Sequence, residues 1–196
     1  MRYNAIEIIK VLKNKNYKIF SNPFSINLVG VRSKKLKVNY FNDVLAVFYN
    51  DKNNDVDYSE YQITTVPGFY YLEHPMNVKG CALLKEGQYP GMWEIGKHFN
   101  QTALVQKNNC TVIRDDDKDD VLDFDTGVEE TGVFAINCHR KNTPGLSLTV
   151  DMGSAGCQVH ADYGRFEDEF MPLMVKASAI TGNSFTYTLI NEKDLS

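Results

Sequence analysis

The residues of this sequence best suited to covalent chemistry are a cysteine and a histidine that lie 18 positions apart. His139 ends an apolar run typical of a strand, and Cys157 follows the small residues of segment 153–156, Gly-Ser-Ala-Gly. If the fold brings the two side chains within hydrogen-bond reach, the imidazole can take the thiol proton and the sulfur can attack a carbonyl carbon. We therefore predict that Cys157 is a nucleophile and that His139 is its general base.

The small residues before Cys157 predict a sharp backbone turn, because glycine adopts conformations that other residues avoid. We expect the N–H groups of Gly156 and Cys157 to be free in this turn to hold a developing oxyanion. Ser154 can hydrogen-bond within the turn, and direct contact with a substrate is its alternative role. Gly156 and Ser154 are thus predicted to support the reaction.

Three further side chains are candidates for substrate binding. Arg140 can bind a peptide carboxylate in bidentate fashion, with a salt bridge to the acidic loop as the alternative. Trp93 lies in the Gly-rich segment 87–98, which predicts a long loop that walls a cleft. A buried Trp that anchors an irregular loop is the equal alternative. His160 can contact a substrate or orient His139, although a backbone carbonyl can orient His139 equally well.

Neither a metal site nor a disulfide scaffold is predicted. The sequence has four cysteines without a C-x-x-C pair, and its His and Cys residues do not cluster at metal-ligand intervals. Cys81, Cys110 and Cys138 are interpreted as small buried apolar residues. The acidic segment 115–120 lacks the glycine and the terminal glutamate of an EF-hand, so a solvated loop is favoured over a Ca²⁺ site. We predict no cofactor and no metal.

The elements that must position these residues are mostly strands. Runs rich in β-branched and aromatic residues predict strands at 26–31, 44–49 and 184–189, and helical spacing is found at 4–13 and 166–180. Residues 103–106 and 110–114 predict a hairpin. No βαβ alternation occurs, so we predict a mainly β fold, a β-sandwich or barrel with one or two helices. Residues 1–25 would form an N-terminal helix or arm, and 26–196 a single catalytic-type β-rich domain.

Composition and charge exclude several classes of partner. The net charge of −4 argues against a nucleic-acid binder, which would present a basic face. No apolar run approaches the ~20 residues that span a bilayer, so no membrane span is expected. Residues 1–20 are interrupted by Asn, Lys and Glu, so we expect no secretory signal peptide. The protein would then be made in the cytoplasm.

Two segments carry a resemblance to a known family. Residues 132–139, Gly-Val-Phe-Ala-Ile-Asn-Cys-His, and 154–157, Ser-Ala-Gly-Cys, resemble the L,D-transpeptidase (YkuD-like) catalytic domain. In that family a strand ending in His is followed, after a loop of similar length, by a Ser-His-Gly-Cys segment. Residues 64–68, Thr-Thr-Val-Pro-Gly, are similar to another strand end of the family, and the resemblance covers roughly residues 62–175. The family's His between Ser and Gly is Ala155 here. The whole chain also resembles uncharacterised proteins of phages and gut bacteria that contain a Ser-Ala-Gly-Cys-Gln segment.

The resemblance implies an L,D-transpeptidase-like fold and cysteine-dependent acyl transfer on peptidoglycan stem peptides. Because no export signal is expected, a phage-type cell-wall peptidase or lysin is favoured over a transpeptidase. Such a protein would reach the wall in a virion or after release at lysis, with peptidoglycan peptide and other virion proteins as partners. The alternative, motivated by Ala155, is a non-catalytic structural or binding module, such as a virion component, on the same fold.

Overall fold

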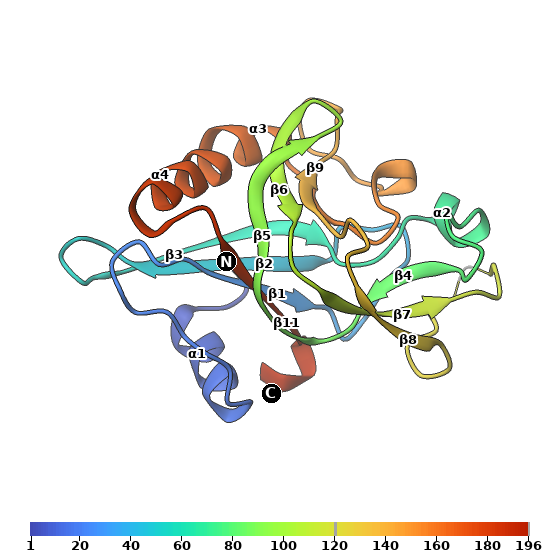
Figure 1. The fold of residues 1–196 in the computed structure, drawn as a ribbon, viewed down its shortest axis with the longest axis horizontal. Helices are drawn as coiled ribbons and strands as arrows, with labels where there is room; N and C mark the ends of the chain where they lie inside the picture. Colours follow the sequence, from blue (N-terminus) through green and yellow to red (C-terminus); the bar gives the residue numbers. More distant parts are fainter. Residues whose placement is uncertain (120, 196) are drawn as a thin grey trace.

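Eight strands close into a barrel in the computed structural model of this protein, which describes residues 1–119 and 121–195 (Figure 1). Around the barrel the strands follow the order β1-β11-β5-β6-β9-β10-β3-β2. Their bounds are β1 (Asn27–Arg32), β2 (Asp43–Asn50), β3 (Val56–Thr64), β5 (Gly87–His98), β6 (Gln101–Gln106), β9 (Cys138–Arg140), β10 (Gln158–His160) and β11 (Phe185–Asn191). The pairs β1 with β11 and β9 with β10 run parallel, and the other pairs are antiparallel.

A second, antiparallel sheet lies beside the barrel (Figure 1). Its strands, in order, are β4 (Cys81–Leu84), β7 (Cys110–Asp115) and β8 (Val128–Gly132). The α-helices are α1 (Ala5–Asn14), α2 (Phe69–Glu73), α3 (Tyr163–Arg165) and α4 (Met171–Thr181), and the other helical segments are the 3-10 helices η1 (Asp151–Gly153) and η3 (Glu192–Leu195) and the π-helix η2 (Phe166–Phe170). Within the described residues, α1 and α4 are the two helices of seven or more residues. The predicted mainly β fold, of the barrel type and with two helices, is confirmed.

Two local predictions are wrong. The Gly-rich segment 87–98 is not a loop but the 12-residue strand β5, because its buried side chains Tyr89, Met92 and Trp93 fill the barrel. The predicted hairpin is also not formed, since β6 pairs with β5 and β9 whereas β7 pairs with β4 and β8. Asp120, part of the predicted acidic loop, lies outside the described residues.

Aromatic side chains contribute much of the buried core of the barrel. Trp93 is fully buried and stacks on Tyr187 with ring centroids 4.3 Å apart. Its indole Nε1 donates a hydrogen bond of 2.7 Å to the carbonyl oxygen of Ile136. Phe166 and Phe170 of η2 are also fully buried and belong to the same core. The core therefore fixes the position of the chain just before β9.

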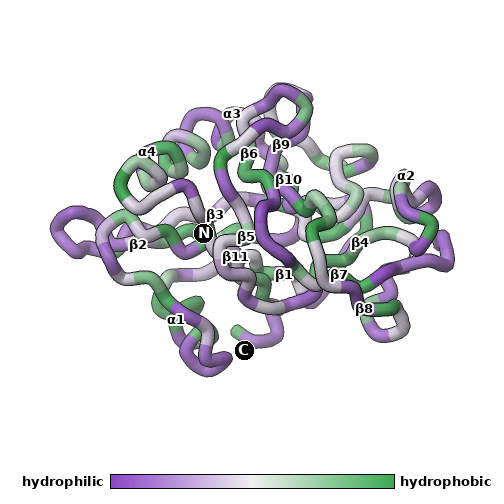
Figure 2. Tube along the Cα trace, viewed as in Figure 1, coloured by the Kyte–Doolittle hydropathy of each residue, from purple (hydrophilic) through white to green (hydrophobic). Residues whose placement is uncertain are grey.

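Helix α1 covers the outer face of β1 and β2. Asn4 and Glu7 form a capping box that starts the helix, and its buried residues, which include Ile8, pack against the outward side chains of the two strands. Both faces of β1 are therefore buried, which accounts for its continuous apolar sequence. Figure 2 shows hydrophobic stretches along α1, while the hairpin tip between β2 and β3 is hydrophilic. In the described part of the chain, no helix is long and apolar enough to cross a membrane.

We expect Trp93→Phe to lower the free energy of unfolding by about 2–4 kcal/mol, because it leaves a void and removes the hydrogen bond to the Ile136 carbonyl. Trp93 is the only tryptophan, so unfolding in urea should be followed by circular dichroism rather than by fluorescence. Val78→Ala, at an exposed position, is the control and should change stability by less than about 0.5 kcal/mol. A loss below about 1 kcal/mol for Trp93→Phe would contradict the anchoring role.

Candidate functional site

Two short parallel strands position the predicted nucleophile and base. In the pairing of β9 with β10, Val159 lies opposite His139. Successive side chains of a strand alternate between its two faces. Cys138 belongs to the barrel core, so its neighbour His139 lies on the outer face, where Cys157 packs with Val159 in a small buried cluster. The thiol and the imidazole therefore share one face of the barrel wall.

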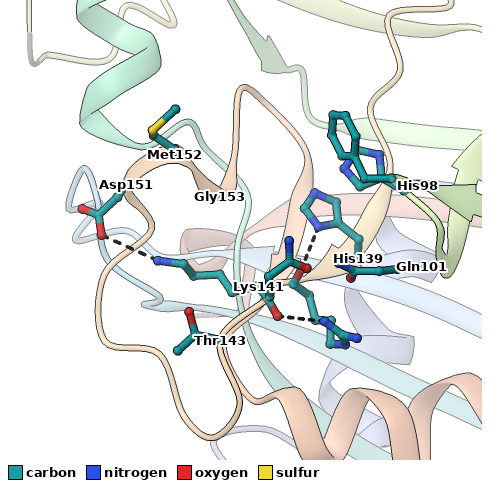
Figure 3. A pocket seen from close by; sticks show the side chains of 11 residues that line it. His98, Gln101, His139, Lys141, Thr143, Asp151, Met152 and Gly153 are labelled. Atoms are coloured by element: carbon teal, nitrogen blue, oxygen red, sulfur yellow. Dashed lines mark hydrogen bonds and ion pairs between the residues drawn. The ribbon is translucent and has the colours of Figure 1, made fainter.

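Cys157 and His139 line the same cavity, which has a volume of about 690 Å³ and is called the larger cavity below. An adjoining smaller cavity of about 400 Å³ shares His98, Phe99 and His139 with it. Figure 3 shows the smaller cavity, with His98 and His139 on one side and Met152 on the other. The two cavities thus adjoin along these shared residues and are together called the cleft below.

The Cys157 thiol is held by the backbone just before β9. Its Sγ lies 3.3 Å from the carbonyl oxygen of Ala135, to which it donates, and it accepts a hydrogen bond from the backbone N–H of Asn137. Burial raises the pKa of Cys157 to about 11, and the Asn137 N–H opposes this rise. The resting side chain is therefore a neutral thiol at pH 7.

The hydrogen bonds of His139 determine which ring nitrogen carries its proton. Nδ1 lies 3.0 Å from the carbonyl oxygen of Arg140. A carbonyl can only accept, so Nδ1 holds the proton and Nε2 has a free lone pair. Burial, followed by the proximity of His98, lowers the pKa of His139 to about 4. Among the described contacts no hydrogen bond joins His139 to Cys157, so the resting pair is neutral and not directly bonded.

A second imidazole, His98, is the site residue that the sequence analysis missed. Its ring stacks on His139 with centroids 4.2 Å apart. Asn137 Oδ1 accepts from the backbone N–H of Gln106, so its Nδ2 is the atom that donates to His98 Nδ1, at 3.0 Å. Nε2 of neutral His98 therefore carries a proton and is a fixed donor. Segment 87–98 was predicted to wall a cleft, and its last residue, His98, does line the cleft. No signal in the sequence pairs His98 with His139, because no known spacing relates the two positions.

Ser154 and Gly156 form the predicted turn before Cys157, with one difference. Ser154 Oγ donates to the carbonyl oxygen of Cys157 at 2.8 Å and accepts from the N–H of Gly156 at 3.1 Å. Ser154 thus has the predicted turn role. The Gly156 N–H is already bonded and is not free to hold an oxyanion, which corrects that expectation. Gly156 has a φ of +128°, and a Cβ there would lie 2.4 Å from the carbonyl oxygen of Ala82.

Trp93 and His160 both point into the barrel and lie outside the cleft. Trp93 is the buried anchor described above, so the predicted substrate contact is not available to it. His160 is 1% exposed and packs among aromatic rings, with its Nε2 3.5 Å from Cys138 Sγ. Burial lowers the pKa of His160 to about 3. It lies on the opposite face of the wall from His139, so it neither orients that residue nor contacts a substrate.

Arg140 is bonded within the protein instead of being free for a substrate carboxylate. Its Nε lies 2.5 Å from Glu167 Oε1, and its guanidinium sits 3.6 Å from the centre of the Tyr163 ring. The predicted bidentate capture of a peptide carboxylate is therefore replaced by an ion pair, with η2 and not with the acidic loop. Its backbone carbonyl nevertheless serves the site, because it orients His139.

The chemistry that these residues can carry is nucleophilic and acid–base. Within residues 1–119 and 121–195, no group of three or more His, Cys, Asp or Glu side chains is arranged to hold a metal ion. Comparison of the chain with protein-family models, curated proteins and solved structures finds no match. The function of the protein must therefore be inferred from its residues and their geometry.

Gly156→Ala should destabilise the protein more than Gly145→Ala does. Both glycines have positive φ angles, but a Cβ at Gly145 meets nothing within 4 Å whereas one at Gly156 overlaps the Ala82 carbonyl. Gly145→Ala controls for the cost of a positive φ, and we expect the overlap to make the loss at Gly156 larger by about 1–3 kcal/mol in the free energy of unfolding. Urea unfolding of both variants tests this, and equal losses would contradict the packing of the turn against β4.

Alkylation of the native protein by iodoacetamide should be slow at pH 7 and should modify Cys157 first as the pH rises. With a pKa of about 11, Cys157 forms about 300-fold less thiolate at pH 7 than free cysteine, whose pKa is about 8.5. Cys81 lines the same cavity and is the internal control, because burial raises its pKa to about 12. Peptide mapping by mass spectrometry identifies the labelled thiol. Rapid labelling of Cys157 at pH 7 would reveal a thiolate–imidazolium pair instead of the neutral one.

Proposed function

We propose that this protein is a cysteine-dependent acyl-transfer enzyme that acts on peptidoglycan stem peptides, as a phage-type cell-wall peptidase. The proposal depends on one observation: Cys157 and His139 line one cavity, and no hydrogen bond from the described residues occupies the Nε2 lone pair of His139. This geometry supports the reaction class. The substrate class is supported by the resemblance of segments 132–139 and 154–157 to L,D-transpeptidases.

In the proposed reaction an amide carbonyl of the stem peptide enters the larger cavity. His139 Nε2 takes the thiol proton as Cys157 Sγ bonds to the carbonyl carbon, because the resting pair is neutral. The tetrahedral intermediate expels the amine, which receives that proton from His139, and a thioester remains. Water then attacks the thioester with His139 again as the base, which releases the carboxylic acid and restores the thiol.

The developing oxyanion needs a hydrogen-bond donor other than the Gly156 N–H. His98 Nε2–H is suited to this role, because Asn137 fixes its tautomer and its ring lies against His139. Burial lowers the pKa of His98, so the ring is a neutral donor near pH 7. The two stacked imidazoles would then have different tasks, one accepting a proton and the other donating a hydrogen bond.

The competing proposal is a non-catalytic structural or binding module, for instance within a virion. It is favoured by the absence of a described hydrogen bond between Cys157 and His139 and by the raised pKa of the thiol. In that case the cleft would bind a partner without reacting with it. Release of new products from a substrate distinguishes the two proposals.

Incubation of purified sacculi with the protein, followed by mass spectrometry of the muropeptides, tests the enzyme proposal. Wild type should release new products, Cys157→Ala should lose essentially all activity, and His139→Gln should be slower by about 10²–10⁴-fold. Cys81→Ala is the matched control, since it removes another buried thiol from the same cavity, and it should retain activity. Identical product profiles for wild type and Cys157→Ala would rule the enzyme out in favour of the module.

A further inference from the structure

The larger cavity has a single formally charged side chain along its wall, Arg114 of β7, among the residues that the structure describes. No carboxylate is found among the described residues that line this cavity, and its two imidazoles have lowered pKa values. The protein as a whole carries a net charge of −4. A cationic cavity in an acidic protein is a specific feature of this site.

Two routes of contact connect Arg114 to the neighbourhood of Cys157. In the pairing of β4 with β7, Arg114 lies directly opposite Ala82, whose carbonyl packs against Gly156. On the other side, the guanidinium lies 5.0 Å from the ring of Phe134. Phe134 directly precedes the residue whose carbonyl accepts the Cys157 thiol. Through these two sets of contacts, the Arg114 guanidinium and the Cys157 sulfur belong to neighbouring parts of the wall of the larger cavity.

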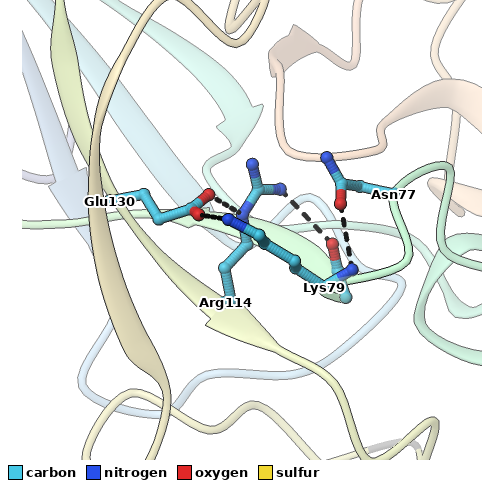
Figure 4. A network of polar contacts seen from close by, with 5 residues as sticks. Asn77, Lys79, Arg114 and Glu130 are labelled. Atoms are coloured by element: carbon cyan, nitrogen blue, oxygen red, sulfur yellow. Dashed lines mark hydrogen bonds and ion pairs between the residues drawn. The ribbon is translucent and has the colours of Figure 1, made fainter.

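The guanidinium is held in place but retains binding capacity. Nε donates to Glu130 at 2.8 Å, and one terminal nitrogen donates to the carbonyl oxygen of Gly80 at 3.3 Å (Figure 4). The other terminal nitrogen has no partner among the described contacts. Glu130 is also paired with Lys79, so its single negative charge is shared between two cations. The cluster of Arg114, Lys79 and Glu130 therefore keeps one net positive charge.

The cations of the smaller cavity are already bonded to acceptors. Arg140 is paired with Glu167, and Lys141 Nζ donates to the carbonyl oxygen of Thr149 and lies 3.6 Å from Asp151. Each of these cations is matched by its own carboxylate, whereas Arg114 and Lys79 share Glu130, so the net positive charge of the cleft lies on the side of Cys157. A molecule with an anionic group would therefore bind with that group on the Cys157 side of the cleft.

We infer that Arg114 forms a carboxylate-binding subsite and that the acyl donor carries a free carboxylate close to the carbonyl that Cys157 attacks. The inference rests on the proposed function and specifies its substrate. Among the carboxylates of stem peptides, the one on the side chain of a diamino acid meets this condition when the carbonyl of that same residue is attacked. The acyl donor then occupies the larger cavity, and the leaving amine lies toward the smaller one, across His98 and His139.

Two synthetic stem peptides test the subsite, one with a free carboxylate on the diamino acid and one with a carboxamide at that position. Binding is measured by calorimetry on the Cys157→Ala protein, and kcat/KM on the active protein. The carboxylate peptide should bind about 10- to 100-fold more tightly, as a charge-assisted hydrogen bond requires. Adding Arg114→Gln should remove this preference by weakening only the carboxylate peptide. Arg165→Gln, which breaks an exposed ion pair with Glu169, is the control and should change neither affinity.

A second variant keeps the test valid if Arg114→Gln fails to fold. Glu130→Gln leaves Arg114 in place and removes the carboxylate that competes for it, so it should strengthen the preference for the carboxylate peptide. Two results would overturn the subsite: equal binding of the two peptides by the protein with Arg114 intact, or equal weakening of both peptides by Arg114→Gln. Either result leaves the enzyme proposal standing. If neither peptide binds or reacts, both proposals are overturned.

Discussion

The parallel pairing of two three-residue strands, β9 and β10, is the constraint on which the candidate site depends. The register that sets Val159 opposite His139 turns Cys157 and His139 to the outer face and Cys138 and His160 to the barrel core. Because side chains alternate, a shift of one residue would exchange these pairs between the two faces. Such short strands cannot fix a register alone, so the neighbouring segments must supply additional contacts.

The segment before β9 supplies those contacts through three consecutive carbonyls. Ala135 accepts the thiol of Cys157, Ile136 accepts the indole N–H of Trp93, and Asn137 accepts the backbone N–H of Gln158. One stretch of backbone thus joins the nucleophile, the barrel core and strand β10. Ala135 has a φ of +58°, a conformation that costs free energy for a residue with a side chain. The surrounding bonds hold it there, and the strained residue lies beside the sulfur.

Local patterns in the sequence were sufficient to predict the β class, the helix at the N-terminus and the turn made by Ser154. They also singled out Cys157 and His139, which line one cavity. The partners of β6 and β7, the strand character of β5 and the position of His98 could not be predicted in this way. Each depends on which distant strands pair, and local preference alone does not decide that choice. The orientation of His160 was missed because strand alternation assigns a face only once the register is known.

The sheet β4-β7-β8 has its own ladder of hydrogen bonds, separate from that of the barrel in the described residues. The reactive pair belongs to the barrel, whereas Arg114 belongs to this smaller sheet. Substitutions in the smaller sheet at positions outside the shared core and away from the Gly156 contact can therefore accumulate without changing the register of β9 and β10. Descendants of one ancestral chain could in this way diverge in the molecules they accept while inheriting the same reaction.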